Sequence, residues 1–302
     1  MSSAPAAAAP GLRTRRLALG AVALAGVLWG GSFWLGKLAL VELTPTWLIA
    51  WRFALAALAL APWVPWRRLR VGRVEAAQIV GGGALAGLVV FVLQFEGLDR
   101  TTASSAALLV AVAPPLLALG GAWVDGERIG RATWLAIALS GLGVALLVGT
   151  PGPGRTLLGD ALCAASMVGA VAWTLVSRRL ARRVGALAAT ALQFAAGLGF
   201  VVALGLVQGG GAVPTSAVGW TAILALGLVC TAATFFLFTW GVLHVEAGRA
   251  GVMANLEPAV GALLGVALLG EALGPGALAG GALLIAAALL ATREASGGEA
   301  TG

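Results

Sequence analysis

Two ionisable side chains, Arg52 and Glu257, stand inside long apolar stretches of this sequence. If those stretches cross a bilayer, a central arginine costs about 2.5 to 3.5 kcal/mol on insertion scales, so it must find water, a partner or a substrate. Glu257 could carry a proton, bind an amine or pair with Arg52. The structural alternatives are an Arg52 that reaches the headgroups or bonds a neighbouring helix, and a protonated Glu257 that donates to a free carbonyl.

Prolines mark the same place in two apolar stretches. Glu257 directly precedes Pro258, and Pro114 lies 144 positions before Pro258 in another stretch. A proline inside a helix removes a backbone hydrogen bond, and paired interruptions in the two halves of a transporter point to its binding site. We therefore predict a substrate or coupling site near Pro114, Pro258 and Glu257, with Asn255 close by.

Aromatic and small polar side chains supply further candidates. Trp29 and Ser32 are three residues apart and so share one face of a helix. Trp173 lies on a similar face of a later stretch, and Gln94 is expected near Arg52. Such faces could line an aromatic-walled cavity, or they could simply pack helices together. Both interpretations stay open for Trp29 and Trp173.

Ten apolar stretches must position these residues. A hydrocarbon core about 30 Å thick needs about 20 helical residues to cross it. The composition agrees, because 60% hydrophobic residues, 10% charged residues and a mean hydropathy of +0.99 leave too little polar surface for a soluble globule. We predict an all-α integral membrane protein whose ten transmembrane helices are 17–36, 45–66, 74–95, 104–124, 132–149, 158–176, 186–207, 217–240, 248–269 and 277–291.

The placement of positive charge predicts the orientation, because loops rich in lysine and arginine stay in the cytoplasm. With both termini cytoplasmic, that side collects Arg13, Arg15, Arg16, Arg67, Arg68, Arg70, Arg73, Arg128, Arg131, Arg178, Arg179, Arg182, Arg183, Arg249 and Arg293. The other side receives only Lys37, Arg100 and Arg155. The net charge of +7 therefore indicates orientation in a cell (inner or plasma) membrane and contact with anionic headgroups rather than with nucleic acid.

The sequence also divides into two similar halves. A shift of 144 positions places Pro114 on Pro258, and a shift of 141 places the segment 51–53 on 192–194. We predict a cytoplasmic tail at 1–16, a first repeat at 17–149, a linker at 150–157, a second repeat at 158–292 and a cytoplasmic tail at 293–302. Because five is an odd number of helices, the second repeat is inverted, which is typical of alternating-access transporters.

Several short motifs then resemble a known family. They are Trp29-Gly30-Gly31-Ser32-Phe33-Trp34, Trp51-Arg52-Phe53, Glu257-Pro258 and Gly270-Glu271. In this order and spacing they resemble the drug/metabolite transporter superfamily, EamA type, over essentially residues 17–292. The resemblance implies a ten-helix inner-membrane carrier, often an exporter of amino acids or other metabolites, with a central cavity between the repeats. It implies no particular substrate.

Catalytic and cofactor chemistry is not indicated. The sequence has no HExxH or GxSxG motif, and its one histidine, His244, cannot make the usual zinc site. We expect no enzyme activity, cofactor or metal, and we predict a secondary active or facilitative transporter of a small metabolite, which could be an amino acid or a drug-like solute, with protons as the coupling ion considered. The alternatives are an intramembrane enzyme and a non-transporting scaffold or helper subunit.

Overall fold

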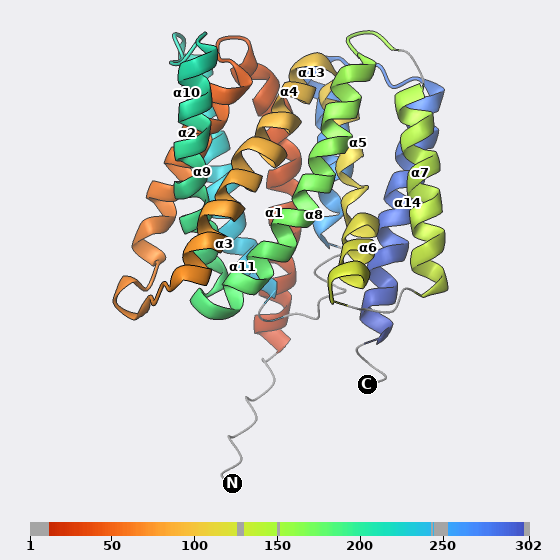
Figure 1. The fold of residues 1–302 in the computed structure, drawn as a ribbon. Helices are drawn as coiled ribbons and strands as arrows, with labels where there is room; N and C mark the ends of the chain where they lie inside the picture. Colours follow the sequence, from red (N-terminus) through yellow and green to blue (C-terminus); the bar gives the residue numbers. More distant parts are fainter. Residues whose placement is uncertain (1–11, 126–129, 150–151, 243, 245–252, 299–302) are drawn as a thin grey trace.

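Apolar helices account for the regular structure of the computed structural model, which describes residues 12–125, 130–149, 152–242, 244 and 253–298 and has no strand in these ranges (Figure 1). The helices are α1 (Leu12–Leu40), α2 (Pro45–Leu60), η1 (Ala61–Trp63), η2 (Trp66–Arg68), α3 (Arg73–Ala84), η3 (Leu85–Val92), α4 (Leu93–Arg100), α5 (Ala103–Val110), α6 (Ala113–Asp125), α7 (Arg131–Gly149), α8 (Leu157–Val184), α9 (Ala186–Gln208), α10 (Ala217–Leu224), η4 (Ala225–Ala233), α11 (Thr234–Val242), α13 (Leu256–Leu269) and α14 (Pro275–Gly298). The expected tail ends 1–11 and 299–302, Arg128 and Arg249 lie outside the described residues.

Eight helical stretches in the described residues are long and apolar enough to cross a bilayer. They are Leu12–Leu40, Pro45–Trp63, Arg73–Arg100, Ala103–Gly120, Arg131–Gly149, Leu157–Val184, Ala186–Gln208 and Ala217–Val242. Two shorter apolar helices, Leu256–Leu269 and Pro275–Leu290, follow them. The protein is therefore an α-helical, multi-pass membrane protein. Several helices run past their apolar stretch, as α8 does through its arginines to Val184.

Two regions of the bundle depart from continuous α-helix at matched places in the sequence. The stretch 104–124, expected as one helix, is two: α5 ends at Val110 and α6 begins at Ala113. Likewise α13 begins at Leu256, after a turn at Asn255. Pro114 and Pro258 each lie in the first turn of the second segment, where a missing N–H costs no hydrogen bond. The prolines therefore each follow a short turn that interrupts the α-helix.

The third spanning stretch of each half contains a π-helix. In the first half η3 joins α3 to α4, and in the second half η4 joins α10 to α11. In η4 the Thr231 hydroxyl donates to the Leu226 carbonyl, five residues earlier, at 2.7 Å. The Thr234 hydroxyl donates in the same way to the Val229 carbonyl. Such π-helical turns occur frequently at functional sites.

Contacts between the two halves come in corresponding pairs. Helix α2 packs on α9, and it also contacts η4, while α9 contacts α3 and η3. Helix α1 packs on α13 and α11, and α8 packs on α5, α6 and α4. Helices α7 and α14 pack on each other at one side of the bundle, on the right in Figure 1.

Glycines allow the closest of these crossings. A Cβ at Gly83 of α3 would lie 2.7 Å from the Gly197 nitrogen of α9, and one at Gly30 of α1 would lie 2.9 Å from the Gly261 nitrogen of α13. Backbones that approach this closely leave no room for a side chain. These glycine pairs therefore serve helix packing.

The bundle has two ends, which we name by their connections. At the terminal face α1 begins and α14 ends, and the connections 61–72 and 185 join α2 to α3 and α8 to α9 (Figure 1). At the opposite face lie the connections 41–44, 101–102, 152–156, 209–216 and 270–274. The eight spanning stretches therefore run between these two faces.

Candidate functional site

Arg52 lies in the interior of the bundle, where α2 meets η4 of the other half. Only 2% of the residue is exposed. Its Nε donates to the Thr231 hydroxyl at 2.6 Å, and one terminal nitrogen, Nη2, lies 3.5 Å from the Cys230 carbonyl oxygen. The guanidinium lies over the Phe91 ring at 4.9 Å and the Phe95 ring at 5.4 Å, which gives cation–π stabilisation. The charge is thus held by a neighbouring helix, and it does not reach the headgroups.

One nitrogen of this guanidinium is not hydrogen-bonded in the described part of the structure. Nη1 of Arg52 is buried and has no hydrogen-bond partner among the described residues. A buried charged donor without an acceptor is costly, and each such group in a folded protein calls for an explanation. An acceptor supplied by a ligand would satisfy Nη1.

An aromatic network extends from Arg52 across the bundle. Phe91, which contacts Arg52, has its ring centroid 6.1 Å from that of Trp173. Trp173 lies 6.2 Å from Phe235, and Phe235 lies 5.4 Å from Trp29. Trp29, Trp173 and Phe235 are only partly buried although each lies well inside a spanning stretch. The two tryptophans that the sequence singled out therefore belong to one aromatic wall.

Glu257 and Asn255 lie at the break before α13. Asn255 is the residue preceding the helix, and Glu257 is in its first turn, where the helix dipole favours a negative charge. The Glu257 side chain is partly exposed, and it makes no hydrogen bond or ion pair with the described residues. Its charge interacts electrostatically with Arg52, but the two do not form a direct ion pair. The Nδ2 group of Asn255, a residue only 9% exposed, has no hydrogen-bond partner in the part of the chain that the structure describes.

The remaining candidates from the sequence occupy more ordinary settings. The Ser32 hydroxyl is buried and donates to the Trp29 carbonyl of its own helix at 2.6 Å. Gln94 is buried on α4, next to Phe95, and its side chain makes no hydrogen bond with the described residues. Pro114 and Pro258 shape the helix breaks and offer no side-chain chemistry. The structure thus brings Arg52 and the two tryptophans into one contact network and places Asn255 and Glu257 at one helix start.

Gln193 was missed as a site residue, although the repeat alignment places Arg52 on it. Its side chain is fully buried, and its Oε1 accepts from the Trp173 indole at 2.9 Å and from the Ser177 hydroxyl at 2.8 Å. Its Nε2 donates to the Gln78 carbonyl of α3 at 3.2 Å. An indole N–H can only donate and a carbonyl can only accept, so these partners fix the orientation of the amide. Gln193 therefore holds Trp173 in place in the aromatic wall.

Two carboxylates join the halves at the opposite face, and no local sequence pattern indicates their partners. Glu271 accepts from the backbone nitrogens of Ala103 and Ser104 at 2.6 and 2.8 Å, and so caps α5. Glu42 accepts from the backbone and hydroxyl groups of Thr215 and Ser216, at the start of α10. The hydrogen bonds from the Ser216 hydroxyl and from Thr215 lower the pKa of Glu42 to about 2.

A buried ion pair also lies at the opposite face. Arg155 and Asp160 are in contact at 2.5 Å, and Asp160 also accepts from the Thr101 hydroxyl. Asp160 is 1% exposed, at the start of α8. This pair joins α8 to the connection before α5, so Arg155 has a structural partner.

Comparisons with known proteins agree with this architecture. An uncharacterized transporter of Bacillus subtilis (strain 168), YetK, is 26% identical over 179 residues, which cover 56% of this chain and about half (53%) of that protein. An uncharacterized transporter of Archaeoglobus fulgidus is 28% identical over 235 residues, which cover 75% of this chain and 80% of that protein. A crystal structure with 22% sequence identity has a similar fold, with a TM-score of 0.64 over 92% of this chain and 97% of the other. The family model of EamA-like transporters matches twice, at residues 16–149 and 157–293, so the chain belongs to the EamA-like transporter family.

Proposed function

We propose that this protein is a secondary active or facilitative transporter of a small molecule, with a cavity at the middle of the membrane between its two halves. The observation that carries the proposal is a set of groups at the centre that find no hydrogen-bond partner among the described residues: Nη1 of Arg52 and Nδ2 of Asn255, which are buried, and the partly exposed carboxylate of Glu257. Transporters place their binding groups at broken helices between repeats. The aromatic wall of Trp29, Trp173 and Phe235 supplies apolar contact area beside them.

We propose that the chain crosses a cell membrane ten times as two inverted five-helix repeats, with both termini in the cytoplasm. Three observations support this organisation: the double family match, the paired contacts between the halves and the matched helix breaks. The orientation rests on the arginine-rich connections at the terminal face. In this orientation the terminal face is cytoplasmic and the opposite face is external.

In this proposal the transport cycle rocks the halves about the central groups. The bonds of Glu42 to Ser216 and of Glu271 to Ser104 hold the opposite face shut in the conformation described above. Turning the cavity toward that face requires these bonds to break. The central residues then divide their roles: Arg52 and Asn255 donate to an acceptor on the substrate, while Glu257 takes up a proton or binds an amine.

Flux measurements in proteoliposomes test the proposal. The purified chain is reconstituted and screened with small amines, amino acids and drug-like solutes, with and without an imposed pH gradient. A transporter gives substrate-dependent flux that Arg52→Gln reduces while membrane abundance stays normal. An intramembrane enzyme would convert a solute without moving it, and a scaffold would do neither, so either result across the screen would refute the proposal.

A further inference from the structure

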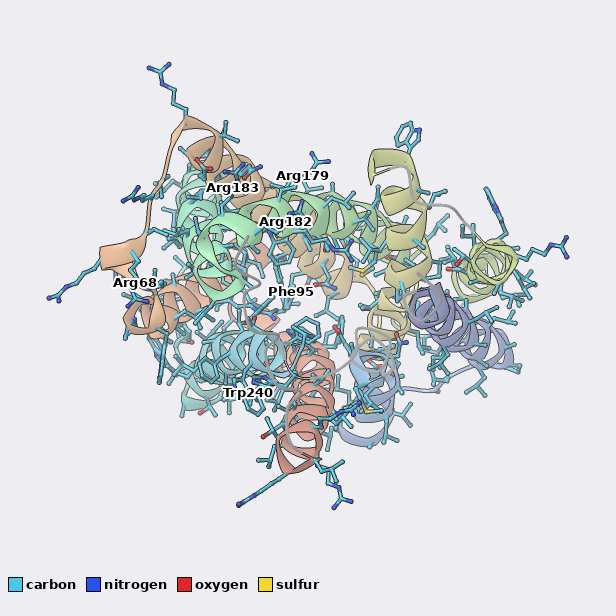
Figure 2. The ribbon with its side chains drawn as sticks, turned by 90° about the horizontal axis from the view of Figure 1, so that it is seen from below. Arg68, Phe95, Arg179, Arg182, Arg183 and Trp240 are labelled. Atoms are coloured by element: carbon cyan, nitrogen blue, oxygen red, sulfur yellow. The ribbon has the colours of Figure 1, made fainter. Side chains whose placement is uncertain are left out.

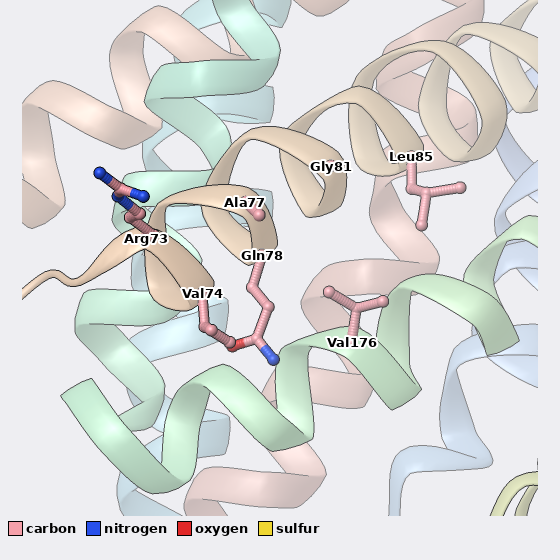
Figure 3. Close-up of a pocket in the computed structure, with 7 residues that line it drawn as sticks. All are labelled: Arg73, Val74, Ala77, Gln78, Gly81, Leu85 and Val176. Carbon is pink, nitrogen blue, oxygen red and sulfur yellow. The ribbon is translucent and has the colours of Figure 1, made fainter.

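A groove of about 590 Å³ runs along the outside of the bundle between α3 and α8, near the terminal face (Figure 3). Its lining is almost wholly apolar, and comes from Arg73, Val74, Ala77, Gln78, Gly81, Leu85 and Val176. Gly81 deepens the groove, because a Cβ at this position would meet nothing within 4 Å. The groove contains none of the central residues Arg52, Asn255, Glu257, Trp29 and Trp173, and it touches them only indirectly, because the Gln78 backbone carbonyl accepts from Gln193.

The length of the groove matches one leaflet of a bilayer. From Val74 to Leu85 the chain advances eleven residues, which is about 16 Å of helix. Half of a hydrocarbon core is about 15 Å. An acyl chain lying in the groove would therefore run from the headgroup level to the middle of the membrane.

Positive charge gathers at the mouth of the groove. Arg73, the first residue of α3, is exposed and makes no hydrogen bond or ion pair with the described residues. On α8, Arg179 and Arg183 follow Val176 by three and seven residues, so they share its helix face. Figure 2 shows Arg179, Arg182 and Arg183 together at the terminal face. The nearby Glu75 carboxylate accepts from the Gly72 backbone nitrogen at 3.0 Å, and its single negative charge offsets only part of the positive charge of these arginines.

A polar side chain inside the groove lies at a matching depth. Gln78 is five residues beyond Arg73, about 7 Å deeper along α3. Its amide can donate hydrogen bonds, and the ester carbonyls of a phospholipid lie just below the phosphate. The groove thus presents a cation, an amide donor and an apolar trough in the order in which a phospholipid presents its phosphate, its esters and its acyl chain.

We propose that this groove binds one anionic phospholipid, with an acyl chain between α3 and α8 and the phosphate at Arg73, Arg179 and Arg183. Basic pockets between transmembrane helices recognise anionic headgroups, at about 1 kcal/mol for each arginine near the surface. The inference is independent of transport, because it holds equally for a protein that moves no solute. The lipid is identified by its charge and its chain, and a free phosphate would use only the arginines.

Native mass spectrometry of the full chain in detergent tests the site, with phosphatidylglycerol and phosphatidylcholine as probes. We expect phosphatidylglycerol to be retained in preference, and Arg73→Gln to weaken it about five-fold. Gly81→Leu fills the groove and should also reduce retention. The matched controls are Arg131→Gln, at the exposed start of α7, and Gly199→Leu, at an exposed glycine of α9 with nothing within 4 Å of its Cβ position.

Four results would overturn the site. They are equal retention of the two lipids, a loss in the controls as large as in the groove variants, unchanged retention in both Gly81→Leu and Arg73→Gln, and full displacement of the lipid by glycerol phosphate, which has the headgroup without the chain. Arg73→Gln is a surface change that leaves the packing intact, so it decides the question if Gly81→Leu does not accumulate.

Discussion

The contribution of the hydrogen bond between Arg52 and Thr231 to the free energy of unfolding can be measured with one isosteric substitution. Thr231→Val keeps the shape of the side chain and removes the hydroxyl that accepts from Arg52 Nε at 2.6 Å and donates to the Leu226 carbonyl at 2.7 Å. Thr234→Val is the matched control. Its hydroxyl also donates to a carbonyl five residues earlier at 2.7 Å, and it forms no hydrogen bond with Arg52 among the described residues.

The magnitude follows from the difference between the two changes. Each variant loses one hydrogen bond to a backbone carbonyl, so that loss cancels. A hydrogen bond to a charged group contributes about 1.5 to 3 kcal/mol. Thr231→Val should therefore lower the free energy of unfolding by about that much more than Thr234→Val does, a difference of ten-fold or greater in the unfolding equilibrium.

Denaturant titration in detergent micelles measures this difference, and a double-mutant cycle with Arg52→Met assigns it. In the Arg52→Met background the two valine variants should cost the same, because the charged partner is absent. If Thr231→Val and Thr234→Val are equally destabilising in the native background, Arg52 is not anchored by η4, and the account of its buried charge given above is wrong.

Three further predictions concern topology, coupling and the closed face. Reporter fusions after Arg70 and Arg183 should read cytoplasmic, and fusions at Gly210 and Arg155 external; identical readings at Arg155 and Arg183 would exclude the inverted repeat. Glu257→Gln should abolish accumulation driven by a pH gradient while leaving substrate exchange partly intact, and full accumulation would remove Glu257 from the coupling role. Because hydrogen bonds lower the pKa of Glu42 to about 2, the ionised side chain stabilises the folded state at neutral pH, and this stabilisation is lost only as the pH falls toward that value. After correction for intrinsic exchange rates, the amides of Thr215 and Ser216 should stay protected from pH 7 to about 4 and should lose protection in Glu42→Gln. Equal protection in that variant would show that the hydrogen bonds of Glu42 do not hold this face closed.

The sequence was sufficient for the class of fold because membrane burial leaves a strong linear signal. Each spanning stretch needs about 20 apolar residues, so the segments can be recognised without knowing their neighbours. The same signal failed at the helix breaks. Beyond its first two serines the stretch 104–124 is apolar, and its prolines indicated only some interruption. The turn at Ala111 and Val112 also depends on the helices that pack around it.

The partners of the site residues depended on contacts that no local pattern records. Arg52 meets Thr231 across 179 positions, and Glu271 meets Ser104 across 167. The π-helical turns η3 and η4 are likewise invisible in composition, because they are set by packing in the third spanning stretch of each half. The alignment of Arg52 with Gln193 was the one clue in the sequence to a residue that it left unassigned.

Arg52 and Gln193, which occupy equivalent positions in the two repeats, show how two similar halves can take different roles. Gln193 is bonded at both ends of its amide, to Trp173, Ser177 and Gln78, so its position is that of a structural link. Arg52, at the equivalent place in the first half, donates through Nε, and its Nη1 finds no acceptor among the described residues. A residue serving structure alone would gain from the complete set of bonds that Gln193 has. An unsatisfied buried donor is costly, and of these two equivalent residues only Arg52 has one. This cost is the strongest reason to propose that the substrate binds on the side of Arg52.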